Sequence, residues 1–311
     1  MKTLLHEGSR MSEQVIGAVD IGGTKIMVGI ADCKGHIACS QSFPTQLGDS
    51  GAENSLVQIV ELLNKQRAQN FRETQNLSGI GVVCAGPIDT KQGIVQNPYT
   101  LPGWEAFPLS RRLSEETGVP VLMENDANGA LLGEVTLRGL IEKRVLMVTV
   151  GTGIGVACMN RGKLYKTGEG YHPEMGHIVI SSQGDKCYCG QTGCFESLCS
   201  GTAVNKRAEK MGFHDFDELF QYSKSGDIKA KEGFWHITDD FSRGLWNLCV
   251  IFKPEVVILG GGLMEKYYVP FSERFLEFTK GQEDFVGQLC VVQAKTQAGS
   301  ALVGAAQLVS E

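Results

Sequence analysis

The residues best suited to bind a metal are concentrated between Glu174 and Glu196. This stretch reads EMGHIVISSQGDKCYCGQTGCFE and contains one imidazole and three thiols within a glycine-rich segment. One histidine and three cysteines form a complete tetrahedral ligand set for zinc. The predicted ligands are His177, Cys187, Cys189 and Cys194. A site closed by four protein ligands has no position for water, so we expect a structural Zn²⁺.

The cysteine spacing limits how this cluster can be interpreted. Cys-x-Cys-x4-Cys differs from the paired Cys-x2-Cys of common zinc fingers. The alternatives are reduced buried thiols or a disulfide between neighbours, and both fit less well. A one-residue gap strains a direct disulfide, and the polar, glycine-rich setting is a poor core. The metal would fix the loop, which makes Glu174 and Glu196 the first candidates for holding a polar ligand.

A second pattern lies near the start of the chain, where two β-branched runs flank the loop DIGGTK at 20–25. We expect a hairpin with a third antiparallel strand after Gly35. The glycines leave backbone N–H groups open to an anion, Thr24 and Lys25 can donate to phosphate oxygens, and Asp20 can hold Mg²⁺ through water. A plain turn is the alternative. The loop lacks the spacing of a P-loop. The residues in question are Asp20, Gly22, Gly23, Thr24 and Lys25.

This pattern is repeated about 130 residues later, where VTVGTGIGVAC spans 148–158. The repeat predicts a duplicated α/β domain in which each half presents one glycine hairpin, and two such hairpins facing each other can clamp a polyphosphate. A dinucleotide-binding reading of the glycines fails because a strand, and no helix, follows them. The second hairpin contributes Gly151, Thr152 and Gly153.

Two other strand ends carry candidate residues. The expected strand 119–123 leads into Glu124, Asn125, Asp126 and Asn128, and then directly into a helix. Asp126 is either a helix cap or a carboxylate that takes a proton from a hydroxyl. The run PEVVILGGGLM at 254–264 predicts a buried strand, three glycines and a helix. Its glycines form either a tight turn or a backbone wall against a nucleotide.

The remaining elements follow from apolar periodicity. Helices are expected at 52–69, 108–118 and 299–310, and strands at 79–84 and 287–293. From Ser200 to Lys253 we expect helices broken near Phe213, Gly226 and Thr238.

Length, composition and charge limit the classes of protein to which this chain can belong. The 311 residues are enough for two domains, and the 39 glycines indicate many tight turns. A net charge of −6 without a basic cluster gives little support for nucleic-acid binding. No apolar run reaches membrane-spanning length and no signal peptide is recognised. We therefore expect a cytoplasmic protein without membrane partners, with the cysteines scattered outside the cluster as reduced core thiols.

Taken together, these motifs resemble the ROK family of sugar kinases, transcriptional repressors and open reading frames. The resemblance runs from about Val15 to the end of the chain. It is carried by DIGGTK, NDAN, GTGIG, EMGH, CYCGQTGC with Glu196, and ILGGG, in that order. It implies an α/β, two-domain, actin-like ATPase fold of the hexokinase type, which is ribonuclease H-like, with ATP, Mg²⁺ and a hexose in the cleft between the domains.

The resemblance also implies roles for individual residues. Asp126 would be the catalytic base that deprotonates the sugar hydroxyl. His177 would serve the zinc and the sugar through its two ring nitrogens. The implied sugar ligands are Gly86, Asn97, Asn125, Asp126, Glu174, His177 and Glu196. The implied nucleotide contacts are Asp20, Gly22, Gly23, Thr24, Lys25, Gly151, Thr152, Gly153, Gly261 and Gly262.

The same resemblance predicts the domain boundaries. We expect a flexible tail at 1–14, an N-terminal α/β domain at 15–124 completed by the helix 299–311, and a larger α/β domain at 125–298. The zinc loop is 177–194. Family repressors carry a winged helix-turn-helix before the first motif. Only about fourteen residues precede Val15 here, without that pattern, which favours an enzyme.

The substrate motifs are mixed. DIGGTK and the full cysteine motif resemble glucokinases and N-acetylhexosamine kinases, whereas His172-Pro173-Glu174-Met175-Gly176-His177 resembles the family's fructokinases. Glucose is therefore the leading prediction, followed by fructose, N-acetylglucosamine and N-acetylmannosamine. The other classes considered are a sugar sensor without turnover and a zinc-dependent hydrolase, which would need an open metal position. A homodimer is expected from the family resemblance alone.

Overall fold

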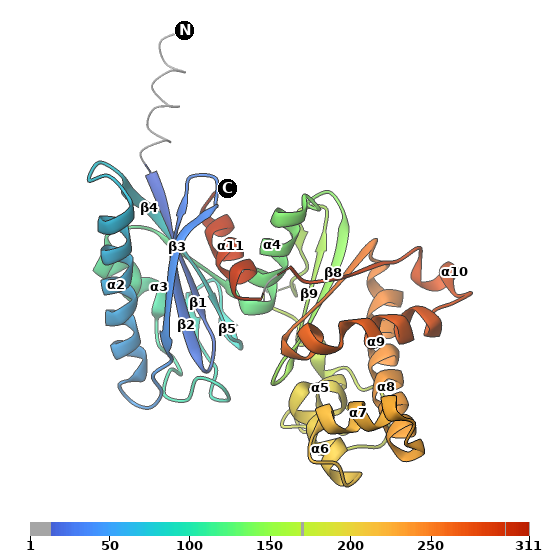
Figure 1. Ribbon diagram of the computed structural model, residues 1–311. Coiled ribbons are helices and arrows are strands. Elements are labelled where there is room, and N and C mark those ends of the chain that lie inside the picture. Colours follow the sequence, from blue (N-terminus) through green and yellow to red (C-terminus); the bar gives the residue numbers. More distant parts are fainter. Residues whose placement is uncertain (1–13, 169–170, 296, 311) are drawn as a thin grey trace. The chain divides into compact units, whose positions relative to one another are not determined.

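The computed structural model describes residues 14–168, 171–295 and 297–310, which form two α/β units (Figure 1). The first unit comprises the described residues of 1–140, 166–172 and 296–311, and the second comprises 141–165 and 173–295. The elements of the first unit are β1 (Gln14–Ile21), β2 (Lys25–Asp32), β3 (Ile37–Pro44), α2 (Gly51–Asn70), β4 (Asn76–Cys84), β5 (Ile88–Asp89), β6 (Ile94–Val95), α3 (Leu109–Thr117), β7 (Val121–Asn125), α4 (Asp126–Arg138) and α11 (Gln297–Ser310).

The second unit contains the remaining elements. They are β8 (Arg144–Val150), β9 (Ile154–Asn160), β10 (Lys163–Leu164), the 3₁₀ helix η1 (Met175–His177), α5 (Phe195–Cys199), α6 (Gly201–Lys210), α7 (Phe216–Ser225), α8 (Ile228–Phe252), β11 (Val256–Gly260), α9 (Gly262–Phe278), α10 (Glu283–Val286) and β12 (Cys290–Gln293).

The first unit is a five-stranded sheet with the order β3-β2-β1-β4-β7. Strand β1 pairs antiparallel with β2 and parallel with β4, and β4 pairs parallel with β7. Because successive side chains point to opposite faces, β1 supplies two cores. Val15 and Val19 pack with α2 and α3, whereas Ile16 and Ala18 pack with α11. The two helix layers lie on opposite faces of this sheet in Figure 1.

Small residues let α11 lie against both α4 and the sheet. A Cβ added at Gly133 of α4 would stand 1.8 Å from the carbonyl oxygen of Ser300 on α11, and one added at Gly304 of α11 would stand 1.8 Å from that of Gly129. On β4, a Cβ at Gly81 would stand 1.7 Å from the carbonyl oxygen of Ala305. Backbone therefore touches backbone along this helix, which was expected at 299–310.

The second unit repeats the topology of the first. Its sheet has the order β10-β9-β8-β11-β12, and β8 pairs antiparallel with β9 and parallel with β11. Each unit thus has a hairpin, a third antiparallel strand and two parallel strands in equivalent positions, as the repeated glycine hairpins predicted. Helices α5 and α7–α9 bury aromatic rings beside this sheet, including Phe195, Phe216, Phe241 and Phe271.

One helix break expected from the sequence is wrong. The chain does leave its helices around Phe213 and at Gly226, but α8 runs without interruption through Thr238. The Thr238 hydroxyl donates back to the carbonyl oxygens of Phe234 and Trp235, at 3.0 Å each. A polar residue in mid-helix is therefore satisfied by its own helix and does not end it.

The two units also divide at a different place from the expected boundary at 124–125. Helix α4 belongs to the first unit because it packs on α11, and the chain passes to the second unit after Leu140. The described residues of 166–172 return to the first unit. The expected tail, except for Gln14 at the start of β1, lies outside the described residues.

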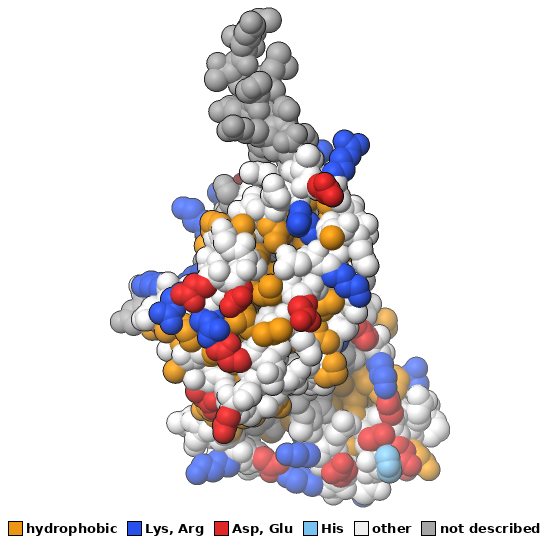
Figure 2. All heavy atoms as spheres, turned by 90° about the vertical axis from the view of Figure 1, so that its left-hand side faces the viewer, with side chains coloured by type: hydrophobic (Ala, Val, Ile, Leu, Met, Phe, Trp, Pro, Cys, Tyr) orange, Lys and Arg blue, Asp and Glu red, His pale blue; other side chains and the backbone are white. Residues whose placement is uncertain are grey.

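No helix among the described residues is long and apolar enough to cross a membrane. On the face shown in Figure 2, lysine and arginine side chains are interspersed with aspartate and glutamate, and they form no basic stripe there. The expectation that this chain binds no nucleic acid stays a prediction.

Candidate functional site

In the first unit, the carboxyl ends of three parallel strands bring the predicted residues to one edge of the sheet. Ile21 of β1 is in register with Cys84 of β4, and Cys84 is in register with Asn125 of β7. The DIGGTK turn, the loop that begins at Ala85 and the start of α4 therefore all leave the sheet together. Ligands of α/β sheets bind at such strand ends.

The DIGGTK turn is held by its own backbone and by neighbouring loops. The Gly22 N–H donates to the Lys25 carbonyl at 3.0 Å, and the Thr45 hydroxyl donates to the Gly22 carbonyl at 2.6 Å. A Cβ at Gly23 would lie 2.8 Å from the carbonyl oxygen of Thr100, so this glycine is needed for a close approach of two loops. The side chains of Thr24 and Lys25 are exposed.

Two carboxylates interact at this edge. The pKa of Asp20 is raised to about 7, chiefly by burial and then by the negative charge of Asp126, while the positive charge of Lys25 acts in the opposite direction. A carboxyl group with such a pKa holds its proton for part of the time at neutral pH. A cation placed beside Asp20 would relieve the repulsion and expel that proton.

The cap of helix α4 is Asn125. Its side-chain oxygen accepts from the N–H groups of Ala127, at 2.9 Å, and Asn128, at 3.4 Å. Asp126 follows in the first turn, where one carboxylate oxygen accepts from the Ala127 N–H at 2.9 Å. The capping role that competed with the catalytic interpretation of Asp126 is thus carried mainly by its neighbour.

A buried polar network that sequence reasoning had not assigned a role stands behind Asn125 and Asp126. Glu124 is almost fully buried, and its carboxylate lies 2.5 Å from the Lys166 ammonium. The same carboxylate accepts from the Asn128 amide at 2.9 Å. The pKa of His172 is lowered to about 4, chiefly by burial. The charge of Glu124 acts in the opposite direction, and the charge of Lys166 contributes to the lowering. In the sequence, the feature that could have indicated this network is the glutamate at the end of an apolar strand.

The loop after β4 contains Gly86 and Asn97, which the structure places differently from each other. Gly86 is half-buried at the strand end. Asn97 is fully buried, and its amide donates to the Ala85 carbonyl at 3.1 Å and to the Thr100 hydroxyl at 2.6 Å. Its oxygen accepts from the N–H groups of Tyr99 and Thr100. Asn97 therefore shapes the loop, and it would have to give up one of these bonds to reach a sugar.

In the second unit, glycines gather around the turn between β8 and β9. The Gly151 N–H donates to the Gly153 carbonyl at 2.9 Å, and the Gly201 N–H at the start of α6 donates to the Gly151 carbonyl at 2.8 Å. Gly261, at the start of α9, has a φ of 96°, and a Cβ there would lie 2.2 Å from the Val150 nitrogen. Gly262 and the exposed Thr152 complete the predicted set.

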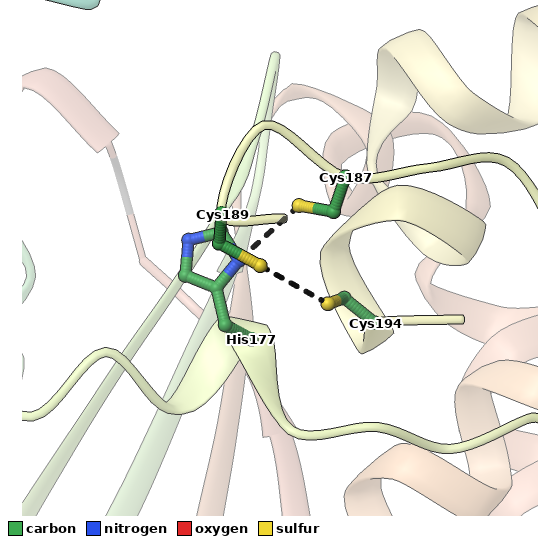
Figure 3. A group of neighbouring side chains, drawn as sticks. All are labelled: His177, Cys187, Cys189 and Cys194. Atoms are coloured by element: carbon green, nitrogen blue, oxygen red, sulfur yellow. Dashed lines mark hydrogen bonds between the residues drawn. The ribbon is translucent and has the colours of Figure 1, made fainter. Parts of the chain in front are cut away.

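The predicted metal ligands lie together in the same unit. The donor atoms of His177, Cys187, Cys189 and Cys194 are all within 4.8 Å of one another (Figure 3). The His177 Nδ1 is 3.4 Å from the Cys187 sulfur, and the Cys189 and Cys194 sulfurs are 3.5 Å apart. Zinc bonds of about 2.0–2.3 Å at tetrahedral angles require separations of roughly 3.6–3.8 Å, so the donor set fits this ion. All ten cysteines are free thiols.

Glu174 and Glu196 flank this cluster, as their positions in the sequence predicted. One oxygen of Glu196 accepts the Ile154 N–H at 2.8 Å, which ties it to the glycine turn. Burial, and then the charge of Glu196, raise the pKa of Glu174, while His177 lowers it. Tyr188, which the sequence reasoning passed over, lies here too. Its hydroxyl is 3.0 Å from the His177 Nε2.

The fold and the residues gathered on each unit define a two-domain α/β protein with the actin-like ATPase fold. Residues 16–311 match the family model for the ROK family, and the chain belongs to that family.

Individual relatives agree with this assignment. A glucokinase from Thermotoga maritima is 30% identical, and the alignment covers 94% of this chain and 96% of that protein. A ROK hexokinase structure from Thermus thermophilus superimposes with a TM-score of 0.82 at 31% identity, covering 94% of this chain and 96% of the other. A ROK glucokinase from Streptomyces griseus, solved with glucose and AMPPNP, gives a TM-score of 0.73 at 28% identity, covering 94% and 98%.

Proposed function

We propose that this protein is an ATP-dependent sugar kinase that transfers the γ-phosphate of ATP to a hexose hydroxyl, with glucose as the leading substrate. The observation that carries the proposal is the pair Asp20 and Asp126 at the common strand ends of a ROK-family chain. The relatives named glucokinase and hexokinase support this reaction, and the glucokinase solved with glucose and AMPPNP supports this pair of substrates.

Asp126 is assigned the role of general base. It stands in the first turn of α4, where Asn125 serves as the cap. Its carboxylate would take the proton of the attacking hydroxyl, a step that contributes roughly 10²–10⁴-fold in rate. Most of the remaining catalysis in phosphoryl transfer comes from positioning and charge neutralisation.

The nucleotide is assigned to the glycine turns. The glycine turns and the helix starts near Gly201 and Gly262 suit phosphate oxygens, and the Thr24 hydroxyl and Lys25 ammonium add donors. Asp20 is the proposed Mg²⁺ residue, because a divalent cation would compensate its charge beside Asp126. Mg²⁺ bound with the nucleotide would supply neutralisation of phosphate charge.

The sugar is assigned to carboxylates, amides and the imidazole. The proposed ligands are Asn125 and Asp126, with Gly86 and Asn97 as secondary contacts, and Glu174, His177 and Glu196. Carboxylates that accept and an imidazole that donates are the groups that bind sugar hydroxyls in fixed orientations.

A structural zinc is assigned to the four-ligand cluster. Its proposed role is to hold the loop that carries His177 and Tyr188 and to fix the start of α5, on which Glu196 lies. Because all four positions are taken by protein, the metal has no place for a catalytic water, which disfavours the hydrolase alternative.

Turnover over a panel of hexoses, measured as sugar-dependent ADP release, tests the proposed function. We expect glucose to give the highest kcat/KM. Preference for fructose, N-acetylglucosamine or N-acetylmannosamine would reassign the substrate within the same reaction. Binding of a hexose without ADP release would support the sensor alternative instead.

The proposed localisation is the cytoplasm, which suits ten free thiols. The proposed assembly is a homodimer, and light scattering would test it.

The base assignment is tested with Asp126→Asn. We expect kcat to fall by roughly 10²-fold or more while hexose binding, followed by calorimetry, is retained. Asp49→Asn changes an exposed carboxylate of the same unit and is the matched control. If Asp126→Asn keeps most of its kcat, another group is the base.

A further inference from the structure

Tyr188 stands between two metal ligands and against the groups assigned to the sugar. Its hydroxyl lies 3.0 Å from the His177 Nε2, and the two rings meet edge to face with centroids 5.0 Å apart. The hydroxyl also forms a hydrogen bond with Glu196. Burial, this neighbouring carboxylate and Glu174 all raise the pKa of the phenol. One phenol thus engages the polar groups that a hexose hydroxyl would need.

The phenol and a sugar hydroxyl would compete for the same hydrogen-bonding positions. A ring nitrogen of histidine makes one in-plane hydrogen bond, as donor or as acceptor. The Nδ1 of His177 faces the Cys187 sulfur, so Nε2 is the nitrogen left for any other group, and Tyr188 occupies it. On Glu196, one oxygen is already committed to the Ile154 N–H. A sugar hydroxyl that binds His177 must therefore take the place of the Tyr188 hydroxyl.

The backbone around Tyr188 is held by hydrogen bonds, whereas its side chain is largely exposed. The Cys187 N–H donates to the Gln191 carbonyl at 2.8 Å, and the Gly190 N–H donates to the Cys187 carbonyl at 3.0 Å. The side chain itself is 61% exposed. Rotation of the ring about its side-chain bonds would thus cost little packing and would leave the metal loop in place.

We propose that Tyr188 is a specificity-determining residue of the proposed sugar kinase. Its hydroxyl takes the place of a hexose hydroxyl on His177 and Glu196 in the sugar-free protein and is displaced when the hexose binds. The inference rests on the proposed function, because it concerns the sugar-binding groups of that same site. The sugar can bind only after the phenol contacts are broken. The apparent affinity therefore equals the intrinsic affinity multiplied by the fraction of sugar-free molecules in which the ring has moved away.

Tyr188→Phe tests this inference, because it keeps the ring and removes the competing hydroxyl. One or two hydrogen bonds of ordinary strength correspond to roughly three- to tenfold, so the KM for the hexose should fall by that factor, with kcat unchanged. An unchanged KM would show that the hydroxyl does not compete. A raised KM would show that Tyr188 binds the sugar directly. Either result overturns the proposal.

Metal content of Tyr188→Phe should match the original protein, since no metal ligand is replaced. The thermal stability of the sugar-free protein should fall slightly, because the hydrogen bonds of the phenol are lost. Tyr222→Phe, which changes another exposed tyrosine of the same unit on α7, should leave KM unchanged and is the matched control.

A second readout does not depend on turnover. With 3-fluorotyrosine incorporated at all seven tyrosines, the ¹⁹F resonance that is missing in Tyr188→Phe belongs to Tyr188. Saturating hexose should shift this resonance strongly, because the ring leaves His177. If the protein turns over a hexose but the resonance does not move, the inference fails and the proposed function stands. If no hexose is phosphorylated or bound, the proposed function fails first.

Discussion

Replacing Asp20 with asparagine is expected to stabilise the ligand-free protein around and above neutral pH while removing its activity. The carboxyl of Asp20 has a pKa raised from 3.8 to about 7, chiefly by burial and then by the charge of Asp126. An asparagine has nearly the same shape and cannot ionise. The substitution therefore removes the cost of holding a carboxylate there, together with the proposed Mg²⁺ residue.

The sign and size of this effect follow from proton linkage. Between pH 3.8 and about 7 the folded protein keeps a proton that the unfolded chain releases, so Asp20 lowers the stability progressively as pH rises. At 1.36 kcal/mol for each pH unit, the full cost reached above pH 7 is about 4 kcal/mol as an upper limit. Roughly 2 kcal/mol of it should develop between pH 5.5 and 8.5.

Urea denaturation of the original protein and of Asp20→Asn at a series of pH values measures this difference. Trp104 is fully buried in the same unit, so its share of the fluorescence of the three tryptophans reports on the unfolding of the part that holds Asp20. The advantage of Asp20→Asn should grow from pH 5.5 to about 7 and then level off. In Asp126→Asn, where the neighbouring charge is gone, the pH dependence should be shallower. Parallel pH profiles for the original protein and Asp20→Asn, or a less stable Asp20→Asn, would refute the reasoning.

Three further changes test the scaffold around the site. Gly133→Ala should lower the free energy of unfolding by about 3 kcal/mol, because its Cβ would meet the Ser300 backbone at 1.8 Å. The Cβ of Gly168→Ala enters open space, so this control should keep the free energy of unfolding, as measured by urea denaturation. Lys166→Met leaves the Glu124 carboxylate buried without its cation. It should lower the free energy of unfolding by about 2 kcal/mol, a value discounted for the partial exposure of Lys166. Lys163→Met, which changes an exposed lysine, should leave the melting temperature unchanged. Cys194→Ser should lose bound zinc, measured by elemental analysis, and lower the melting temperature, whereas the exposed Cys290→Ser should keep both; equal zinc content in the two variants would contradict the ligand assignment.

Local sequence determined the parts of this protein that local chemistry dictates. Apolar runs flanking Gly22 and Gly23 can hardly form anything but a hairpin, and the same pattern at Gly151–Gly153 disclosed the duplication that the two sheets repeat. The cysteine motif predicted the metal cluster because all four ligands lie within eighteen residues of chain, so one short loop can bring them together. Signals of this kind need no knowledge of distant neighbours.

Contacts between distant segments decided the rest. Whether Asp126 caps a helix depended on Asn125 taking that role, which follows from the path of the chain out of β7. The buried Glu124 is paired with Lys166, which lies forty-two residues away in the sequence. Asn97 is likewise hydrogen-bonded within the loop that folds around it. Helix α4 joined the first unit because Gly129 and Gly133 meet α11. Periodicity reports how each segment alternates apolar and polar residues, but the partner that fills each face is chosen by packing of the whole chain.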